Sequence, residues 1–428
     1  MGALVHLLGS RCRYDPGVAR PQLHRSPSIL SHADFRALRR FAALDGVRAV
    51  AVLLVVVTHT RGPRPLHYLG GWNGVTIFFV LSGFLITTLA LREEERSGRM
   101  SLRAFYVRRA FRILPLYLLV LFLYVPIVFV LKLGDAAKFA HALPFYGSPF
   151  PEIPFFTGGG HVPFEISWSL GIEEKFYVLW PLLAFGLLYY WRRARLPLAI
   201  AFAVLLWVAE LAPHASRFVF PYFHILIGCI VALLLHNRRS FDQLRRLGHR
   251  EAVIPLLLTA AALQIWSSFG LPPLVIPFYT LAVAALLISL VVSTRSSTGF
   301  LARQPLVYIG TISYALYLTH QLGLGISEKL VPIRVGWYGD IGSLAIGLGL
   351  AIALCALLHR WIELPMIARG RRLAAVLVAG GGSATSAGTT GGAPARFRDT
   401  RDARSVATQV VPGSSGSNPH PSAAPGSG

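Results

Sequence analysis

The chain has 428 residues, a mean hydropathy of +0.56, 54% hydrophobic residues and only 14% charged ones. Soluble domains are about a quarter charged, so this composition argues against an ordinary soluble enzyme. The net charge of +22 comes from 41 Lys and Arg against 19 Asp and Glu, and these cations fall in clusters between long apolar runs. That distribution favours membrane topology over nucleic-acid binding.

The first 40 residues carry seven Arg but no compact apolar core followed by a cleavage site. We therefore expect a basic, disordered arm over 1–40 and no cleaved signal peptide. The three Cys residues, Cys12, Cys229 and Cys355, are far apart, and two of them lie in apolar runs. They indicate neither a disulfide framework nor a Cys-rich site, and we expect no bound metal.

Ten apolar segments follow the arm, each about as long as a helix needs to cross a bilayer. They predict an all-α integral membrane protein with spans at 42–60, 71–91, 111–131, 169–191, 196–212, 218–236, 252–269, 272–293, 304–323 and 341–366. Residues 41–370 would form one membrane-embedded domain. The Gly, Ser, Ala and Pro residues that dominate 371–428 predict a disordered tail.

Loop charge sets the expected orientation, because Lys and Arg in short loops stay in the cytoplasm. Arg-rich segments occur at alternate connections, namely 92–109, 192–195, 238–250, 295–303 and 369–372. With the basic arm, they predict that both termini are cytoplasmic. The long outer connection over 133–167 is rich in aromatic residues, which could stack on a sugar or simply mark the bilayer interface.

The first span carries charged side chains, which are costly in lipid and are therefore candidate functional residues. Arg48 and His59 are eleven residues apart, which places them on one helical face about 16 Å from each other. Asp45 lies one turn before Arg48. Because this span runs outward, we expect Arg48 on the cytoplasmic side and His59 near the outer end. Each residue also has a plainer interpretation: Arg48 as an arginine whose side chain extends to the bilayer surface, and His59 as a histidine at the bilayer interface.

The fourth and ninth spans bring further polar groups to the outer half. The fourth begins at Trp168, runs inward and carries Glu173, which we expect near His59 or as a cap of its helix. The ninth span has three polar residues at i, i+4 and i+7 on one face: Ser313, Tyr317 and His320. His320 alone would more often be a packing residue.

Arginines also cluster at the inner end of the third span, where Arg108, Arg109 and Arg112 stand. Arg109 and Arg112 are one turn apart, and a pair of planar guanidinium groups suits a phosphate-bearing ligand. The cytoplasmic bias of basic residues would also place arginine there. Glu363, at the inner end of the tenth span, is a candidate partner for one of these cations or part of a buried ion pair.

In this order, these pieces resemble the membrane-bound acyltransferase family 3, whose members O-acylate bacterial surface polysaccharides. The resemblance covers about 41–370. Arg48 with His59 matches the family's Arg-x10-His span, and Arg109-Ala110-Phe111-Arg112 matches its Arg-x-x-Arg loop. The series is completed by Phe78 to Phe84, Trp168-Ser169-Leu170 with Glu173, Ser313-Tyr314 with Tyr317 and His320, and Glu363 with Pro365.

The resemblance implies an acyl-CoA-dependent O-acyltransferase of the bacterial inner membrane, with no bound cofactor. Acyl-CoA, expected as acetyl-CoA, would dock near Arg108, Arg109 and Arg112. Arg48 would lie along its path. His59, oriented by an acid such as Glu173, would take the proton from a hydroxyl of a cell-envelope carbohydrate or glycolipid. Some family members add a hydrolase-like domain after the last span, and we expect none here.

Other interpretations stay open at this point. Some relatives acylate cytoplasmic macrolide-like metabolites, and a histidine-bound acyl intermediate is a second chemical route. Ser82 is disfavoured as a nucleophile, because no His or Lys stands at helical spacing in its segment. A transporter or flippase would suit ten spans equally well, although the sequence shows no pair of related halves. We expect no nucleic-acid partner, and the sequence does not indicate an oligomeric state.

Overall fold

The computed structural model of the protein describes residues 29–38, 40–60, 66, 68–157, 161–210, 216–269, 276–293, 299–330 and 337–383. Regular structure in these ranges is helical, apart from an isolated bridge between Ile29 and Ser293. The predicted all-α fold class is therefore confirmed. Residues 1–28 of the expected arm and 384–428 of the expected tail lie outside the described residues.

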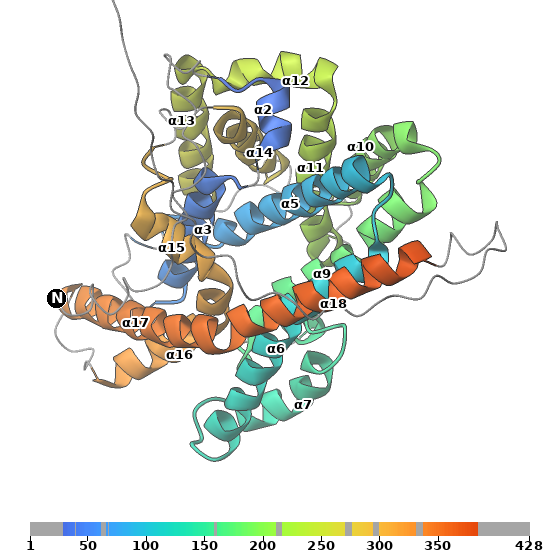
Figure 1. Cartoon of the computed structure of the whole chain (residues 1–428). Coiled ribbons are helices and arrows are strands. Elements are labelled where there is room, and N and C mark those ends of the chain that lie inside the picture. Colours follow the sequence, from blue (N-terminus) through green and yellow to red (C-terminus); the bar gives the residue numbers. More distant parts are fainter. Residues whose placement is uncertain are drawn as a thin grey trace, which may run out of the picture. The chain divides into compact units, whose positions relative to one another are not determined.

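Figure 1 shows the helices in chain order. The first half contains α2 (His32–Ala37), α3 (Ala42–Thr58), α5 (Asn73–Ser97), α6 (Leu102–Phe129), α7 (Ala136–Tyr146), α8 (Ile153–Thr157), η1 (Glu165–Ser167), α9 (Trp168–Pro181), η2 (Leu182–Leu187) and η3 (Arg192–Ala194). The second half contains α10 (Arg195–Glu210), α11 (Ser216–His236), α12 (Arg238–Leu244), η4 (Arg245–Gly248), α13 (Arg250–Ser267), α14 (Ile276–Val292), α15 (Gln304–Thr311), α16 (Ser313–Leu330), α17 (Trp337–Leu358), η7 (His359–Glu363) and α18 (Leu364–Ser383).

Four helical segments in the described part of the chain are long and apolar enough to cross a membrane: Asn73–Ser97, Leu102–Phe129, Phe218–His236 and Ile341–Ala379. Two shorter apolar helices, Glu251–Ser267 and Ile276–Val292, accompany them. The multiple apolar helices indicate an integral membrane protein.

The predicted ninth span is wrong in one respect, because residues 304–323 form two helices instead of one. α15 ends at Thr311, and Ile312, with a ψ of 6°, leaves the helical conformation before α16 begins. Gly310, just before the break, packs against the backbone of Asp45 in α3. At the C-terminal side, α18 continues to Ser383, past the expected domain boundary at 370.

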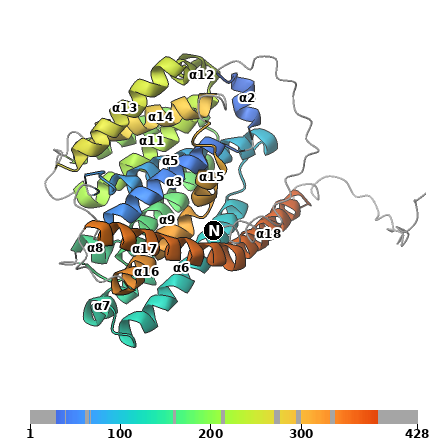
Figure 2. The ribbon, with the colours of Figure 1, turned by 90° about the vertical axis from the view of Figure 1, so that its left-hand side faces the viewer.

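Helix α3 lies in the middle of the bundle, in contact with α5, α14, α15 and α16 (Figure 2). The backbone of α3 approaches its neighbours closely on two sides, and each close approach depends on a glycine. A Cβ at Gly46 would overlap the backbone of Leu301, and a Cβ at Gly74 would overlap that of Ala51. Small residues let helix backbones meet in this way inside membranes, where apolar burial gives no driving force between helices.

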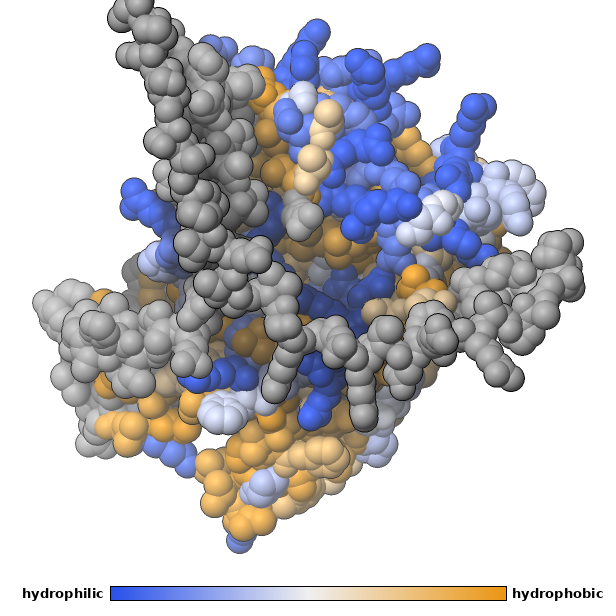
Figure 3. All heavy atoms as spheres, viewed as in Figure 1, coloured by the Kyte–Doolittle hydropathy of each residue, from blue (hydrophilic) through white to orange (hydrophobic). Residues whose placement is uncertain are grey.

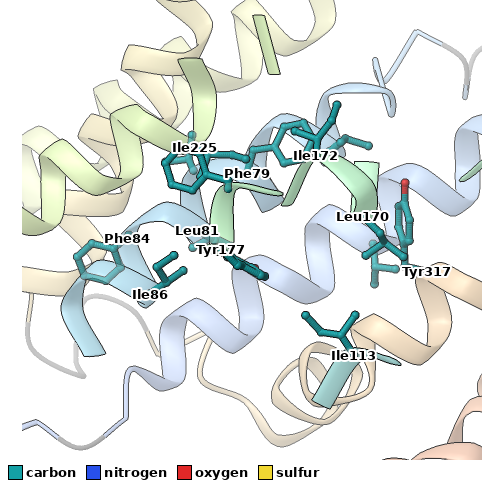
Figure 4. Close-up of a cluster of buried hydrophobic side chains, with 14 of the residues drawn as sticks. Phe79, Leu81, Phe84, Ile86, Ile113, Leu170, Ile172, Tyr177, Ile225 and Tyr317 are labelled. Atoms are coloured by element: carbon teal, nitrogen blue, oxygen red, sulfur yellow. The ribbon is translucent and has the colours of Figure 1, made fainter. Parts of the chain in front are cut away.

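Helices α5 and α11 form an extensive contact, which also depends on glycine. A Cβ on Gly83 would overlap the carbonyl of Ile225, and a Cβ on Gly228 would overlap the carbonyl of Val80. The buried side chains Phe79, Phe84 and Ile225 fill the space beside this crossing (Figure 4).

Large apolar side chains also cover the outside of the bundle. On α10, Phe202, Leu205 and Val208 are each at least half exposed, which suits contact with lipid chains. Hydrophilic residues instead gather near α2 and α12, at one end of the molecule (Figure 3). Four exposed arginines lie on α12 and η4: Arg238, Arg239, Arg245 and Arg246. This end matches the surface that the sequence predicts to be cytoplasmic.

The last part of the expected N-terminal arm is folded at that same end. Helix α2 packs on α12, and Ser31 caps it by accepting a hydrogen bond from the backbone N–H of Asp34. Arg92 in α5 donates to the carbonyls of Leu38 at 2.6 Å and Phe35 at 3.0 Å. These bonds tie α2 to the C-terminal end of α5.

The α5–α11 crossing gives a test of the packing. Gly228→Ala should destabilise the detergent-solubilised protein by about 1–3 kcal/mol, because the new methyl group must displace the backbone of α5. Gly349→Ala in α17 is the matched control, since its Cβ would enter open space. Thermal unfolding followed by circular dichroism measures both, and equal stability of the two variants would contradict the close crossing.

Candidate active site

A cavity of about 180 Å³ lies among α3, α5, α6, α9 and α16, and we call it the arginine cavity. Its polar lining residues are Arg48, Ser82, Arg109, Arg112, Ser169, Glu173, Tyr177, Ser313, Tyr314 and Tyr317. The structure thus brings together residues that stand far apart in the sequence. Apolar side chains, including the buried Ile113 and Leu170, form the rest of its wall (Figure 4).

The carboxylate of Glu173 is held by two hydroxyl groups. Ser82 donates to Oε1 at 2.9 Å, and Tyr177, one turn along α9, donates to Oε2 at 3.0 Å. Both oxygens therefore have a fixed donor that carries no charge. Sequence spacing does not predict the Ser82 contact, because the two residues are 91 positions apart.

The three arginines of the cavity have no such partners. Within the described part of the chain, the guanidinium groups of Arg48, Arg109 and Arg112 make no hydrogen bond or ion pair. Arg109 stacks over the rings of Phe105, at 5.5 Å, and Tyr177, at 5.0 Å, which orients it without neutralising it. Three cations thus face one carboxylate, a strongly electropositive arrangement for the interior of a helix bundle.

His59 stands at the opposite end of α3 from Arg48, directly after the last helical residue. Its Nδ1 lies 2.8 Å from the carbonyl oxygen of Val55. A carbonyl can only accept, so neutral His59 carries its proton on Nδ1. The Nε2 lone pair is then free to accept a proton from another group.

His320 lies beside His59, with ring centroids 4.9 Å apart. Its Nδ1 is 2.7 Å from the carbonyl oxygen of Tyr317, so it has the same tautomer. The ring is fully buried, and its Nε2 has no hydrogen-bond partner among the described residues. The structure therefore brings together two histidines that are 261 positions apart in the sequence.

A second and much smaller cavity adjoins His59, and we call it the histidine cavity. Its volume is about 10 Å³, enough for roughly one water-sized group. The lining includes Thr58, His59, Trp72, Phe155, Glu165, Trp168 and Tyr317. Glu165 is its acidic residue, and this carboxylate also accepts from Nδ1 of His161 at 2.8 Å and from the backbone N–H of Val162 at 3.2 Å.

Tyr317 and Val75 line both cavities and separate them. The hydroxyl of Tyr317 donates to the carbonyl of Ile166 at 3.1 Å and lies 2.8 Å from Oγ of Ser169. Since the tyrosine proton is engaged by the carbonyl, Ser169 is the donor of the second bond. The ring is thus fixed between the arginine cavity and the histidine cavity.

Besides His320, which contacts His59, three predicted site residues line neither cavity. Arg108 pairs with Glu93 at 2.6 Å, and Asp45 pairs with Arg40 at 2.8 Å. Glu363 was considered as a partner of the α6 arginines, but its partner is His359, whose Nδ1 lies 2.7 Å away in η7. The remaining predicted residues line a cavity or, like His320, contact one that does.

The predicted proximity of Glu173 to His59 is not found. Glu173 lines the arginine cavity, and the acid beside His59 is Glu165, which sequence analysis missed. Glu165 belongs to a short 3₁₀ turn before α9, so its orientation depends on the loop fold and not on helical periodicity. The His161–Glu165 spacing of four residues was the one available signal. The described residues contain no group of three His, Cys, Asp or Glu arranged to hold a metal ion.

A family model and several bacterial proteins match this chain. Residues 41–360 match the model of the acyltransferase domain. The chain is 30% identical over 368 residues to YrhL of Bacillus subtilis, provisionally named a peptidoglycan O-acetyltransferase, covering 78% of this chain and 56% of the relative. It is 27% identical over 353 residues to the peptidoglycan O-acetyltransferase OatA of Listeria monocytogenes, covering 77% of this chain and 56% of the relative.

A shorter match, 34% identical over 161 residues, joins 36% of this chain to 26% of a Staphylococcus aureus protein provisionally named an O-acetyltransferase. The chain spans 56% of the length of YrhL and of OatA. No solved structure matches it.

The unpaired arginines predict that the cavity binds an anion. Inorganic diphosphate should raise the midpoint of thermal unfolding of the wild-type protein, because a ligand that binds only the folded state stabilises it. Arg112→Gln should remove most of this shift. Arg108→Gln is the matched control and should respond as the wild type does, because Arg108 already pairs with Glu93. Equal shifts in both variants would show that diphosphate binds elsewhere.

Proposed function

The chain belongs to this acyltransferase family, and from that premise we propose that it transfers an acetyl group from acetyl-CoA to a hydroxyl of a cell-envelope carbohydrate. The observation that carries the proposal is the pairing of two sites around Tyr317. On one side lie three arginines that share a single cavity carboxylate, Glu173, and on the other lies a histidine with a free Nε2.

The arginine cavity suits the phosphate-bearing donor. A planar guanidinium binds phosphate oxygens through two parallel hydrogen bonds, and Arg109 and Arg112 present this geometry from adjacent turns of α6. At about 180 Å³, the cavity is smaller than the 300 Å³ or more typical of a site that encloses a drug-sized ligand. Only part of acetyl-CoA would therefore lie inside, with the remainder extending toward the cytoplasmic end.

His59 is the proposed general base. Its Nε2 takes the proton of the acceptor hydroxyl as the hydroxyl oxygen attacks the thioester carbonyl carbon. The tetrahedral intermediate then collapses with cleavage of the C–S bond, and the leaving thiolate receives the proton back from the imidazolium. Glu165, in the same cavity, stabilises that imidazolium by its negative charge.

The relatives' names guide the choice of acceptor. Two of them are named peptidoglycan O-acetyltransferases, one provisionally, so we propose a polysaccharide of the bacterial cell envelope as the acceptor. Transfer would take place in the inner membrane. The histidine cavity, at the end of α3 farther from the exposed arginines, would then face the side where an exported glycan arrives.

We also propose a membrane topology that places the donor and the acceptor on opposite sides of the membrane. Ten spans with both termini in the cytoplasm place α12 and the inner ends of α5 and α6 on the donor side. Helix α3 then crosses from Arg48 on that side to His59 near the outer surface. In this arrangement the broken segment α15–α16 acts as one crossing.

The base assignment predicts the behaviour of His59→Gln. This variant keeps a polar side chain but should lower kcat by about 10²- to 10⁴-fold, the usual contribution of general base catalysis. The measurement follows coenzyme A release with a thiol reagent, using protein in nanodiscs and a soluble peptidoglycan glycan as acceptor. His141→Gln, an exposed histidine on α7, is the control and should leave kcat unchanged. Near wild-type transfer by His59→Gln would exclude His59 as the base.

A further inference from the structure

Three aromatic rings form a continuous stack next to His59, and we call them the aromatic platform. The rings of Phe155 and Trp168 are 4.9 Å apart and only 8° from parallel. Trp72 stacks on the same group, 5.8 Å from Phe155 and 6.0 Å from Trp168. These residues come from α8, α9 and the start of α5, so the platform joins three separate segments.

The platform is open on one side only. Trp168 is 7% exposed and Phe155 is partly buried, whereas 49% of the surface of Trp72 is exposed. An indole that stacks on two rings yet keeps half of its surface free presents a rigid apolar face. Trp72 is therefore the contact surface of the platform.

The backbone fixes Trp72 beside the histidine. Gly71 and Gly74, on either side of it, pack so tightly on the end of α3 that a Cβ at Gly71 would overlap Leu54 and one at Gly74 would overlap Ala51. Trp72, His59 and Glu165 consequently line the same cavity. The platform is thus part of the wall that surrounds the proposed base.

The size of that cavity limits what can enter. At about 10 Å³ it admits roughly one hydroxyl-sized group and cannot take a sugar ring. If a hydroxyl enters to reach His59, the ring that carries it must stay outside. Trp72 lines this cavity and is 49% exposed, so it offers an aromatic surface at the cavity for such a ring. The carboxylate of Glu165 accepts two hydrogen bonds within the protein and has lone pairs left for another hydroxyl.

A second stacked aromatic pair lacks the neighbours that surround Trp72. Tyr68 is also 49% exposed and stacks on Phe269 at 5.2 Å, but it does not line the histidine cavity. Tyr68 is thus an exposed, stacked aromatic ring that does not share a cavity lining with His59 or Glu165. Tyr68 therefore provides an internal comparison for Trp72.

We propose that the aromatic platform and Glu165 form the subsite for the acceptor saccharide, with one sugar ring stacked on Trp72 and one of its hydroxyls directed to His59. The inference rests on the proposed function, because the acetyl group must be delivered to that hydroxyl. It adds a neutral saccharide as the recognised class of ligand and Trp72 as the residue that sets acceptor affinity.

The first experiment measures saccharide binding without a donor. Chitotetraose, a soluble oligomer of N-acetylglucosamine, is titrated into the full chain in nanodiscs, and binding is followed by saturation-transfer NMR. The wild type and Tyr68→Ala should bind alike. Trp72→Ala should weaken binding by roughly three- to tenfold, and Trp72→Phe should keep most of the affinity because an aromatic face remains. Unchanged binding by Trp72→Ala, or no binding by the wild type, would overturn the subsite.

The second experiment separates this subsite from the proposed function. In the coenzyme A release assay, Trp72→Ala should raise the KM for the saccharide by the same factor while the KM for acetyl-CoA stays constant. If the wild type binds chitotetraose but releases no coenzyme A in the presence of any envelope glycan, the transferase proposal fails and the saccharide site stands. If transfer occurs with an unchanged saccharide KM in Trp72→Ala, the subsite fails and the transferase proposal stands.

Discussion

The cost of burying unpaired positive charge governs the centre of this structure. Arg48, Arg109 and Arg112 converge inside a helix bundle, where a lone cation is poorly solvated. The nearby carboxylate of Glu173 is already satisfied by Ser82 and Tyr177, and it offsets at most one of the three charges. An anionic ligand that enters the cavity would supply the missing charge, which is why we propose a donor that carries phosphate.

Helix α3 connects that charge to the proposed chemistry. It carries Arg48 in its N-terminal half and His59 at its C-terminal cap, and glycine contacts fix it against α5 and α15. Tyr317 stands between the two cavities, held by Ser169 and the carbonyl of Ile166.

Much of this arrangement could be predicted from sequence. Helical periodicity placed Arg48 and His59 on one helix, and the two cavity arginines of α6 were recognised by their spacing of one turn. The partners of the acids could not be predicted. Glu173 bonds to Ser82 through the packing of α5 on α9, and Glu165 reaches the histidine cavity from a 3₁₀ turn. Such contacts depend on tertiary structure, which periodicity does not encode.

The fold, like the site, was predictable only in part from the sequence. Hydropathy located the apolar helices because a membrane requires long apolar segments, but it treated residues 304–323 as one span. The break at Ile312 follows from the packing of Gly310 on the backbone of α3, a contact between distant parts of the chain. Likewise, the aromatic residues of the outer loop were visible in the sequence, but their alignment beside His59 was not.

The most direct test of the central claim is a structure of the full chain in nanodiscs with a non-reactive acetyl-CoA analogue, in which a methylene group replaces the thioester sulfur. The account predicts phosphate density against Arg109 and Arg112, with the acetyl group directed toward Tyr317 and the histidine cavity. An analogue bound elsewhere, with the three guanidinium groups still without an anionic partner, would contradict it.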